Sequence, residues 1–103
     1  MDELIGKQKS HLRGLGQALQ PLLTVGKSGL TPAVAATVGE LLSRRELVKV
    51  RLPAGPPAER AVLARQLAEA VGAAVAGAVG RTVLLYRPGT GVPPAARVEL
   101  PPD

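Results

Sequence analysis

The sequence has no cysteine, tryptophan or phenylalanine, and only one tyrosine and one histidine among its 103 residues. Without cysteine it can form no disulfide framework, thiolate zinc site or thiol nucleophile. Its single aromatic residue, Tyr86, excludes RNA recognition by stacked rings, which needs several aromatic side chains. His11 has no sulfur partner, and the 8 acidic residues show no spacing typical of a metal site or a triad. We therefore expect no enzyme activity, catalytic residue, cofactor, metal or small-molecule substrate.

The sequence also lacks a long hydrophobic run and a basic leader. Its first residues include Asp2 and Glu3, where a signal peptide carries positive charge. The longest weakly apolar stretch, residues 70–80, is about half of a membrane span. We expect a cytoplasmic protein with no membrane partner. A chain of this length forms one domain, which we place at residues 1–88, followed by an extended or loosely ordered proline-rich tail at residues 89–103.

Positive charge is in excess. The 13 Lys and Arg residues exceed the 8 acidic residues, which gives a net charge of +5. Such an excess favours polyanionic partners such as RNA, DNA or an anionic membrane surface. A surface made basic only for solubility is the alternative, because an excess of this size is modest.

Hydrophobic periodicity predicts three helices and four strands. Thr31 and Pro32 are typical of a helix start, Gly72 of a helix end, and Gly80-Arg81 of a hairpin turn. We expect Leu15 and Val62 to point into the core. The predicted helices cover residues 3–19, 32–45 and 58–71, and the predicted strands cover residues 22–25, 47–52, 74–79 and 82–87.

The order α-β-α-β-α-β-β predicts an α/β fold. Strands that alternate with helices indicate parallel crossovers, and the terminal hairpin makes the sheet mixed. We expect a two-layer domain with a four-stranded sheet, acting as a monomer.

The segment Gly26-Lys27-Ser28-Gly29 follows a strand and precedes a capped helix. It is not a nucleotide-binding P-loop, because that motif requires glycine at the position of Pro21. As a G-x-x-G loop, it would let a nucleic-acid backbone approach its glycines closely, while Lys27 supplies charge and Ser28 a hydroxyl group. An ordinary tight connection between strand and helix is the alternative.

Other basic residues fall on predicted surface positions of several elements. Lys49 and Arg51 lie on the exposed face of the second strand, and Arg81 lies in the hairpin turn. Singly, each is best interpreted as a solvated charge, but together they could form one basic surface. The candidate RNA-binding residues are Gly26, Lys27, Ser28, Gly29, Lys7, Arg13, Arg44, Arg45, Lys49, Arg51, Arg81 and Arg87.

Four segments resemble the YhbY-like family, also called the CRM (chloroplast RNA splicing and ribosome maturation) domain. They are residues 7–15, residues 19–21 together with 25–31, residues 46–50 and residues 80–88, in the family's order and spacing. The loop Gly26–Gly29 and the ending Leu85-Tyr86-Arg87-Pro88 are the most specific parts. The sequence departs from the family at Gln20, where many members have lysine.

The resemblance implies a fold similar to the C-terminal domain of translation initiation factor three. It also implies binding to RNA, and for bacterial members association with precursors of the large ribosomal subunit. The alternative is a protein-interaction module that docks on ribosomal proteins or an assembly factor without touching RNA. DNA binding is a weaker alternative, because no groove-reading motif stands out.

Overall fold

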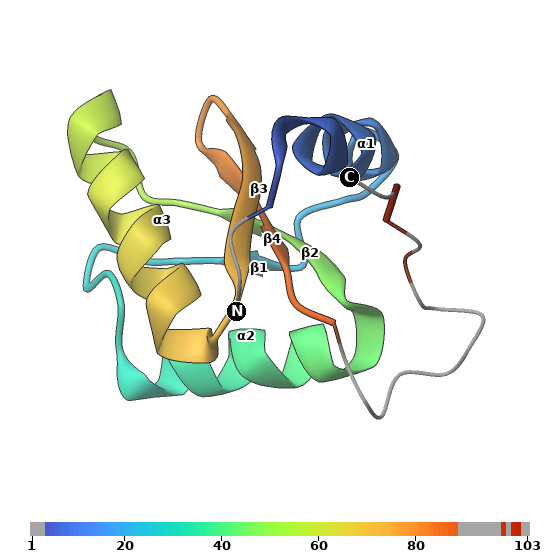
Figure 1. The fold of residues 1–103 in the computed structure, drawn as a ribbon. Helices are drawn as coiled ribbons and strands as arrows, with labels where there is room; N and C mark the ends of the chain where they lie inside the picture. The colour runs from blue at the N-terminus through green and yellow to red at the C-terminus, as the bar shows by residue number, and fades with distance from the viewer. Residues whose placement is uncertain (1–3, 89–97, 99, 102–103) are drawn as a thin grey trace.

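A computed structural model describes residues 4–88, 98 and 100–101 of the chain. It confirms the α/β fold, with three helices and a four-stranded mixed sheet (Figure 1). The elements are α1 (Gly6–Gly16), β1 (Leu23–Thr24), α2 (Pro32–Arg45), β2 (Leu47–Arg51), α3 (Pro57–Val71), β3 (Ala74–Val79) and β4 (Thr82–Tyr86).

The sheet has the strand order β1-β2-β4-β3. Strand β1 is parallel to β2, whereas β4 is antiparallel to both of its neighbours, β2 and β3. The hairpin therefore inserts its second strand into the middle of the sheet. A register shift between Val75 and Gly77 marks a bulge at Ala76 in the edge strand β3.

The domain has three layers, so the expectation of two layers is wrong. Helices α2 and α3 cover one face of the sheet, where Val48 and Leu85 belong to the larger core cluster. Helix α1 covers part of the other face, where Leu12 packs in a smaller cluster with Leu47 and Tyr86 (Figure 1). The alternating pattern of β2 predicts that Lys49 and Arg51 face solvent. Leu47 lies on the same face as these two residues, and it is apolar, so α1 can pack on it.

Local signals fix the helix ends. The Thr31 hydroxyl accepts a hydrogen bond from the Val34 amide at 3.2 Å, and Pro32 occupies the first turn of α2. Gly72 ends α3 in the left-handed conformation, with φ of 66°. Helix α1 is shorter than predicted, and the Gln8 side chain accepts a hydrogen bond from the Ile5 amide at its start.

Two inward-facing predictions are wrong. Leu15 and Val62 are exposed, at 43% and 46% of their surfaces. The contact face of α1 instead runs along Leu12 and Gly16, because glycine lets the helix approach the Leu84 side chain closely. In α3 the buried face follows the small residues Ala64 and Ala68 together with Leu67 and Val71.

The last described residues return to the smaller core cluster. Val98 and Leu100 pack against it, and the Val98 amide donates to the buried Glu46 carboxylate at 2.7 Å. The Gln8 side chain donates to the Pro101 carbonyl at 3.2 Å. These three residues, in the tail that we expect to be extended or loosely ordered, therefore pack against the domain; residues 89–97, 99 and 102–103 of that tail lie outside the described part of the chain.

Candidate nucleic-acid interface

The loop Gly26–Gly29 is a tight turn between β1 and α2. The Gly29 amide donates to the Gly26 carbonyl at 3.0 Å, and Gly29 has φ of 68°, a conformation that favours glycine. Lys27 and Ser28, at the corners of the turn, are exposed. A phosphate can therefore reach three groups at one small site: the Lys27 ammonium, the Ser28 hydroxyl and the glycine backbone, where no Cβ atom stands in the way.

The N-terminus of α2 adds little to this loop as an anion site. Pro32 has no amide hydrogen, and the Val34 amide already donates to Thr31. Of the first three helical positions, only Ala33 can direct an N–H group toward an anion. The Lys27 and Ser28 side chains are therefore the main polar groups that the loop offers.

Arg51 and Arg81 lie beside this loop at the same end of the sheet. The Val25 amide, one residue before the loop, donates to the Arg51 carbonyl at 2.8 Å. On the other side of β2, the Leu52 amide donates to the Arg81 carbonyl at 2.6 Å, and the Arg81 Nε donates back to the Leu52 carbonyl at 3.1 Å. Neighbouring strands are about 4.8 Å apart. The loop, Arg51 and Arg81 thus occupy three adjacent positions, and we call this set the loop end.

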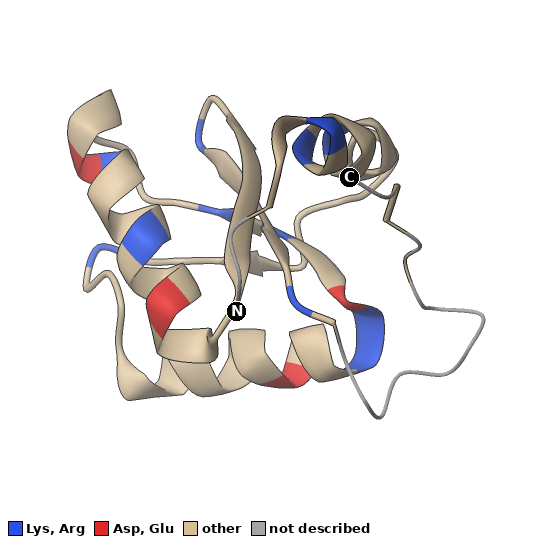
Figure 2. Cartoon of the chain, in the orientation of Figure 1, with Lys and Arg blue, Asp and Glu red and all other residues tan. Residues whose placement is uncertain are grey.

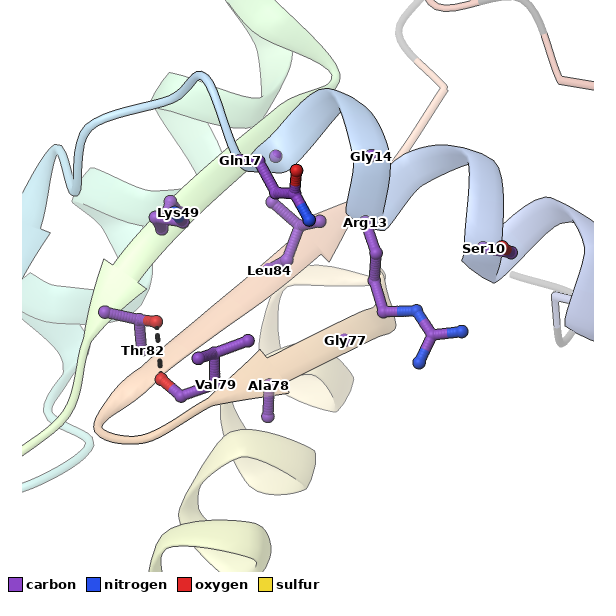
Figure 3. A pocket seen from close by; sticks show the side chains of 11 residues that line it. Ser10, Arg13, Gly14, Gln17, Lys49, Gly77, Ala78, Val79, Thr82 and Leu84 are labelled. Carbon is purple, nitrogen blue, oxygen red and sulfur yellow. Dashed lines mark hydrogen bonds between the residues drawn. The ribbon is translucent and has the colours of Figure 1, made fainter.

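Arg13 and Lys49 meet at a groove next to the loop end. The groove, of about 410 Å³, lies between the second half of α1 and the strands β2, β4 and β3 (Figure 3). Lys49 is half-buried, not exposed as predicted, because α1 covers this face; its ammonium group donates to the Leu19 carbonyl at 3.3 Å. The remaining donors of Lys49 can still face a ligand in the groove.

Arg87 is bound within the fold. Its guanidinium group donates to the Val71 carbonyl at 2.7 Å, the Gly39 carbonyl at 2.7 Å and the Ser43 hydroxyl at 2.8 Å. These acceptors belong to α2 and α3, so Arg87 ties both helices to the end of β4. We assign it a structural role and set it apart from the free basic residues.

The other basic candidates lie away from the loop end. Arg44 and Arg45 are in the last turn of α2, and Arg44 pairs with Glu40 at 2.7 Å. The loop adjoins the opposite end of this 14-residue helix, and a rise of about 1.5 Å per residue separates the two ends by about 20 Å. Lys7 is exposed in the first turn of α1, between one and two turns before Arg13. The twelve candidates therefore do not form one continuous patch (Figure 2).

Sequence reasoning missed Gly77 and Gln17, which also line the groove. A Cβ atom on Gly77 would lie 2.6 Å from the Arg13 Cγ, so this glycine makes room for the arginine. A glycine inside a predicted strand is a recognised sign of a bulge or close approach, and it could have identified Gly77. Nothing in the local pattern singles out Gln17.

Two buried residues, Glu46 and Tyr86, and the half-buried Arg87 lie at the other end of the sheet, which we call the anchor end. Glu46 is 4% exposed and adopts φ of 60°, which is uncommon for a residue with a side chain. Burial, and then the nearby Glu46 charge, raise the pKa of the Tyr86 phenol. Tyr86 is 3% exposed, so it packs in the core and is not available to stack on RNA.

Within the described residues, no group of three or more His, Asp or Glu side chains could hold a metal ion. In the same part of the chain, no helix has both the length and the apolar character needed to cross a membrane.

The CRS1 / YhbY (CRM) domain family matches residues 4–87. An RNA-binding protein of Haemophilus influenzae is 31% identical over 101 residues, which cover 98% of each chain. The probable RNA-binding protein MJ0652 of Methanocaldococcus jannaschii is 37% identical over 91 residues, covering 86% of this chain and 67% of the relative. The solution structure of the hypothetical Staphylococcus aureus protein SAV1595, described as a candidate RNA-binding protein, superimposes with a TM-score of 0.82. It is 30% identical, and the match covers 95% of this chain and 99% of that one.

Proposed function

Because the chain belongs to the CRS1/YhbY (CRM) domain family, we propose that it binds RNA through the phosphate backbone. The observation that carries this proposal is the loop end, where the turn Gly26–Gly29, Arg51 and Arg81 occupy adjacent positions. Cations that face solvent beside a glycine-rich turn suit phosphate oxygens, which carry charge but no sequence information. The names of the relatives from Haemophilus influenzae and Methanocaldococcus jannaschii agree with this proposal.

The RNA that we propose is ribosomal, in precursors of the large subunit, and the chain acts there as a cytoplasmic monomer without catalysis. This part of the proposal rests on the family resemblance. Sedimentation of lysate through a gradient tests it, because the chain should travel with large-subunit precursors and leave them after nuclease treatment. Sedimentation with mature small subunits alone would contradict it.

A titration of binding against salt tests the backbone mechanism. If about four to six phosphates are neutralised, the logarithm of the affinity for large-subunit ribosomal RNA should fall with a slope of roughly −3 to −5 against the logarithm of salt. Filter binding measures this slope directly. A salt-independent affinity would rule out a phosphate-based interface.

The substitution Lys27→Asp tests the loop itself. Lys27 is exposed, so the variant should fold normally, yet it places a carboxylate where the phosphate should lie. We expect a loss of affinity of about tenfold or more, since one contact of 1.4 kcal/mol already gives that factor. Arg45→Asp is the charge-matched control, because Arg45 is equally exposed but lies at the far end of α2. Equal losses in the two variants would remove the loop from the interface.

One observation favours the alternative function of a protein-interaction module. Val62 is 46% exposed on α3, and Leu63 of the same helix lies near Gly29 of the loop. An apolar patch beside the loop could contact a ribosomal protein. In the sedimentation experiment, association that survives nuclease treatment but is lost in Val62→Asp would support this alternative.

A further inference from the structure

The groove beside α1 differs from the loop end in having an apolar floor. Val79 and Leu84 line it from the hairpin β3–β4; Val79 keeps 77% of its surface exposed, whereas Leu84 is 5% exposed and forms the bottom of the groove under α1. In Figure 3, these two side chains lie between Lys49 on β2 and Arg13 on α1. A phosphate-binding surface alone has no use for an exposed apolar floor.

Two glycines shape this groove. The Cβ that Gly77 lacks would lie 2.8 Å from the Arg13 Cδ, so the arginine stem can run close across β3. The Cβ that Gly16 lacks would lie 2.7 Å from the Leu84 Cδ2, so the helix can pack directly on the strand. The Arg13 stem therefore lies close to β3 at the rim of the groove, and its guanidinium group points outward (Figure 3).

The polar groups around the floor suit an anion with a flat, hydrogen-bonding body. Among the described residues that line the groove, none is acidic, while Arg13 and Lys49 supply positive charge. Gln17 adds an amide, and the Thr82 hydroxyl, which donates to the Val79 carbonyl at 2.8 Å, can still accept a hydrogen bond. A volume of about 410 Å³ lies within the range of roughly 300–1,000 Å³ that is typical of small-ligand sites.

We propose that this groove binds one unstacked nucleotide of single-stranded RNA, with the base over Val79 and Leu84 and the flanking phosphates at Arg13 and Lys49. This inference rests on the proposed RNA binding and adds a preference for unpaired nucleotides. Bases that leave the stack are bound by aromatic or apolar side chains and by arginine planes, and a duplex does not offer its bases in this way. Lys49 is two residues from Arg51 on the same face of β2, so one RNA strand can pass from the groove to the loop end.

The substitution Val79→Ala tests the base contact without changing charge or core. We compare binding of a single-stranded RNA of about ten nucleotides, within the usual site size, with the same strand carrying abasic sites. Val79→Ala removes part of the proposed base contact, so it should lower the affinity for the intact strand by about threefold to tenfold. The affinity for the abasic strand should not change. The matched control, Val62→Ala, removes the same methyl groups from an exposed site on α3 and should change neither affinity.

The outcomes separate this inference from the proposed function. If Lys27→Asp weakens binding but Val79→Ala does not, the loop remains the interface and the groove proposal is overturned. Equal losses of Val79→Ala on intact and abasic strands would also overturn it, because the base would then play no part. If the wild-type chain binds neither strand at low salt, the proposed RNA binding fails as well. Circular dichroism of each variant verifies that the fold is retained.

Discussion

The two ends of the sheet use their polar residues in opposite ways. At the loop end, Lys27 and Arg51 are exposed, and a glycine turn leaves the backbone accessible. At the anchor end, Glu46 and Tyr86 are buried, and Arg87 donates to three acceptors in α2 and α3. Polar and charged side chains therefore hold the fold together at one end and remain available for a ligand at the other.

This contrast has a physical cause in the helix ends. Helices α2 and α3 both finish near the anchor end, where their last carbonyl groups need donors. Arg87 supplies one to Val71, the last residue of α3. The loop end receives the start of α2, where Thr31 caps the Val34 amide and Pro32 has no amide hydrogen, so few N–H groups remain unsatisfied and no charged side chain is needed there.

Arg87→Met should have the largest effect. It removes a charged donor from the Val71 and Gly39 carbonyls, and hydrogen bonds to charged groups contribute about 1.5–3 kcal/mol, so we expect a loss of stability of about 2–3 kcal/mol. Urea unfolding of the variant and of the wild-type chain measures this loss of stability. Arg51→Met is the matched control at the loop end and should stay within about 0.5 kcal/mol of wild type. Similar losses at the two positions would contradict the contrast.

A smaller effect distinguishes the two glycines of the loop. Gly29 has φ of 68°, so Gly29→Ala should cost about 1–2 kcal/mol in the free energy of unfolding. Gly26 has no positive φ, and its added Cβ would meet no atom within 4 Å, so Gly26→Ala should leave stability nearly unchanged. If RNA backbone approaches this turn, Gly26→Ala should nevertheless weaken binding in a filter assay. Unchanged affinity would mean that no close approach occurs there.

The elements of the fold were largely predictable because their signals are local. Thr31-Pro32 start α2, and Gly80-Arg81 turn the hairpin, as neighbouring residues alone indicate. The exposed positions of Leu15 and Val62 were not predictable, because they depend on how closely a glycine or alanine face packs on the sheet.

The candidate site was predictable only where its residues are close in sequence. The turn Gly26–Gly29 is such a case, but its relation to Arg51 and Arg81 depends on strand order. The sequence alone predicts Arg87 as an RNA-binding residue, because its hydrogen-bond partner Gly39 lies 48 residues away in the sequence. The position of Arg13 was not predictable either, because its contact with Gly77 depends on where α1 crosses β3.

The smallest expected effect concerns Tyr86 at the anchor end, and it appears as a pH dependence of stability. Burial raises the pKa of Tyr86 in the folded chain above the usual value of 10.0, so the unfolded chain loses this proton first as the pH rises. The stability that Tyr86 contributes is therefore fully present below about pH 10 and is lost as the pH rises from there toward the folded pKa.

Tyr86→Phe has no phenol to ionise, so its stability should fall less steeply over that window. Urea unfolding at a series of pH values measures the difference between the two chains, in which the titration of lysines cancels. Parallel curves for both chains would show that the Tyr86 phenol ionises equally easily in the folded and unfolded states, and that the anchor end is more open to water than its packing indicates.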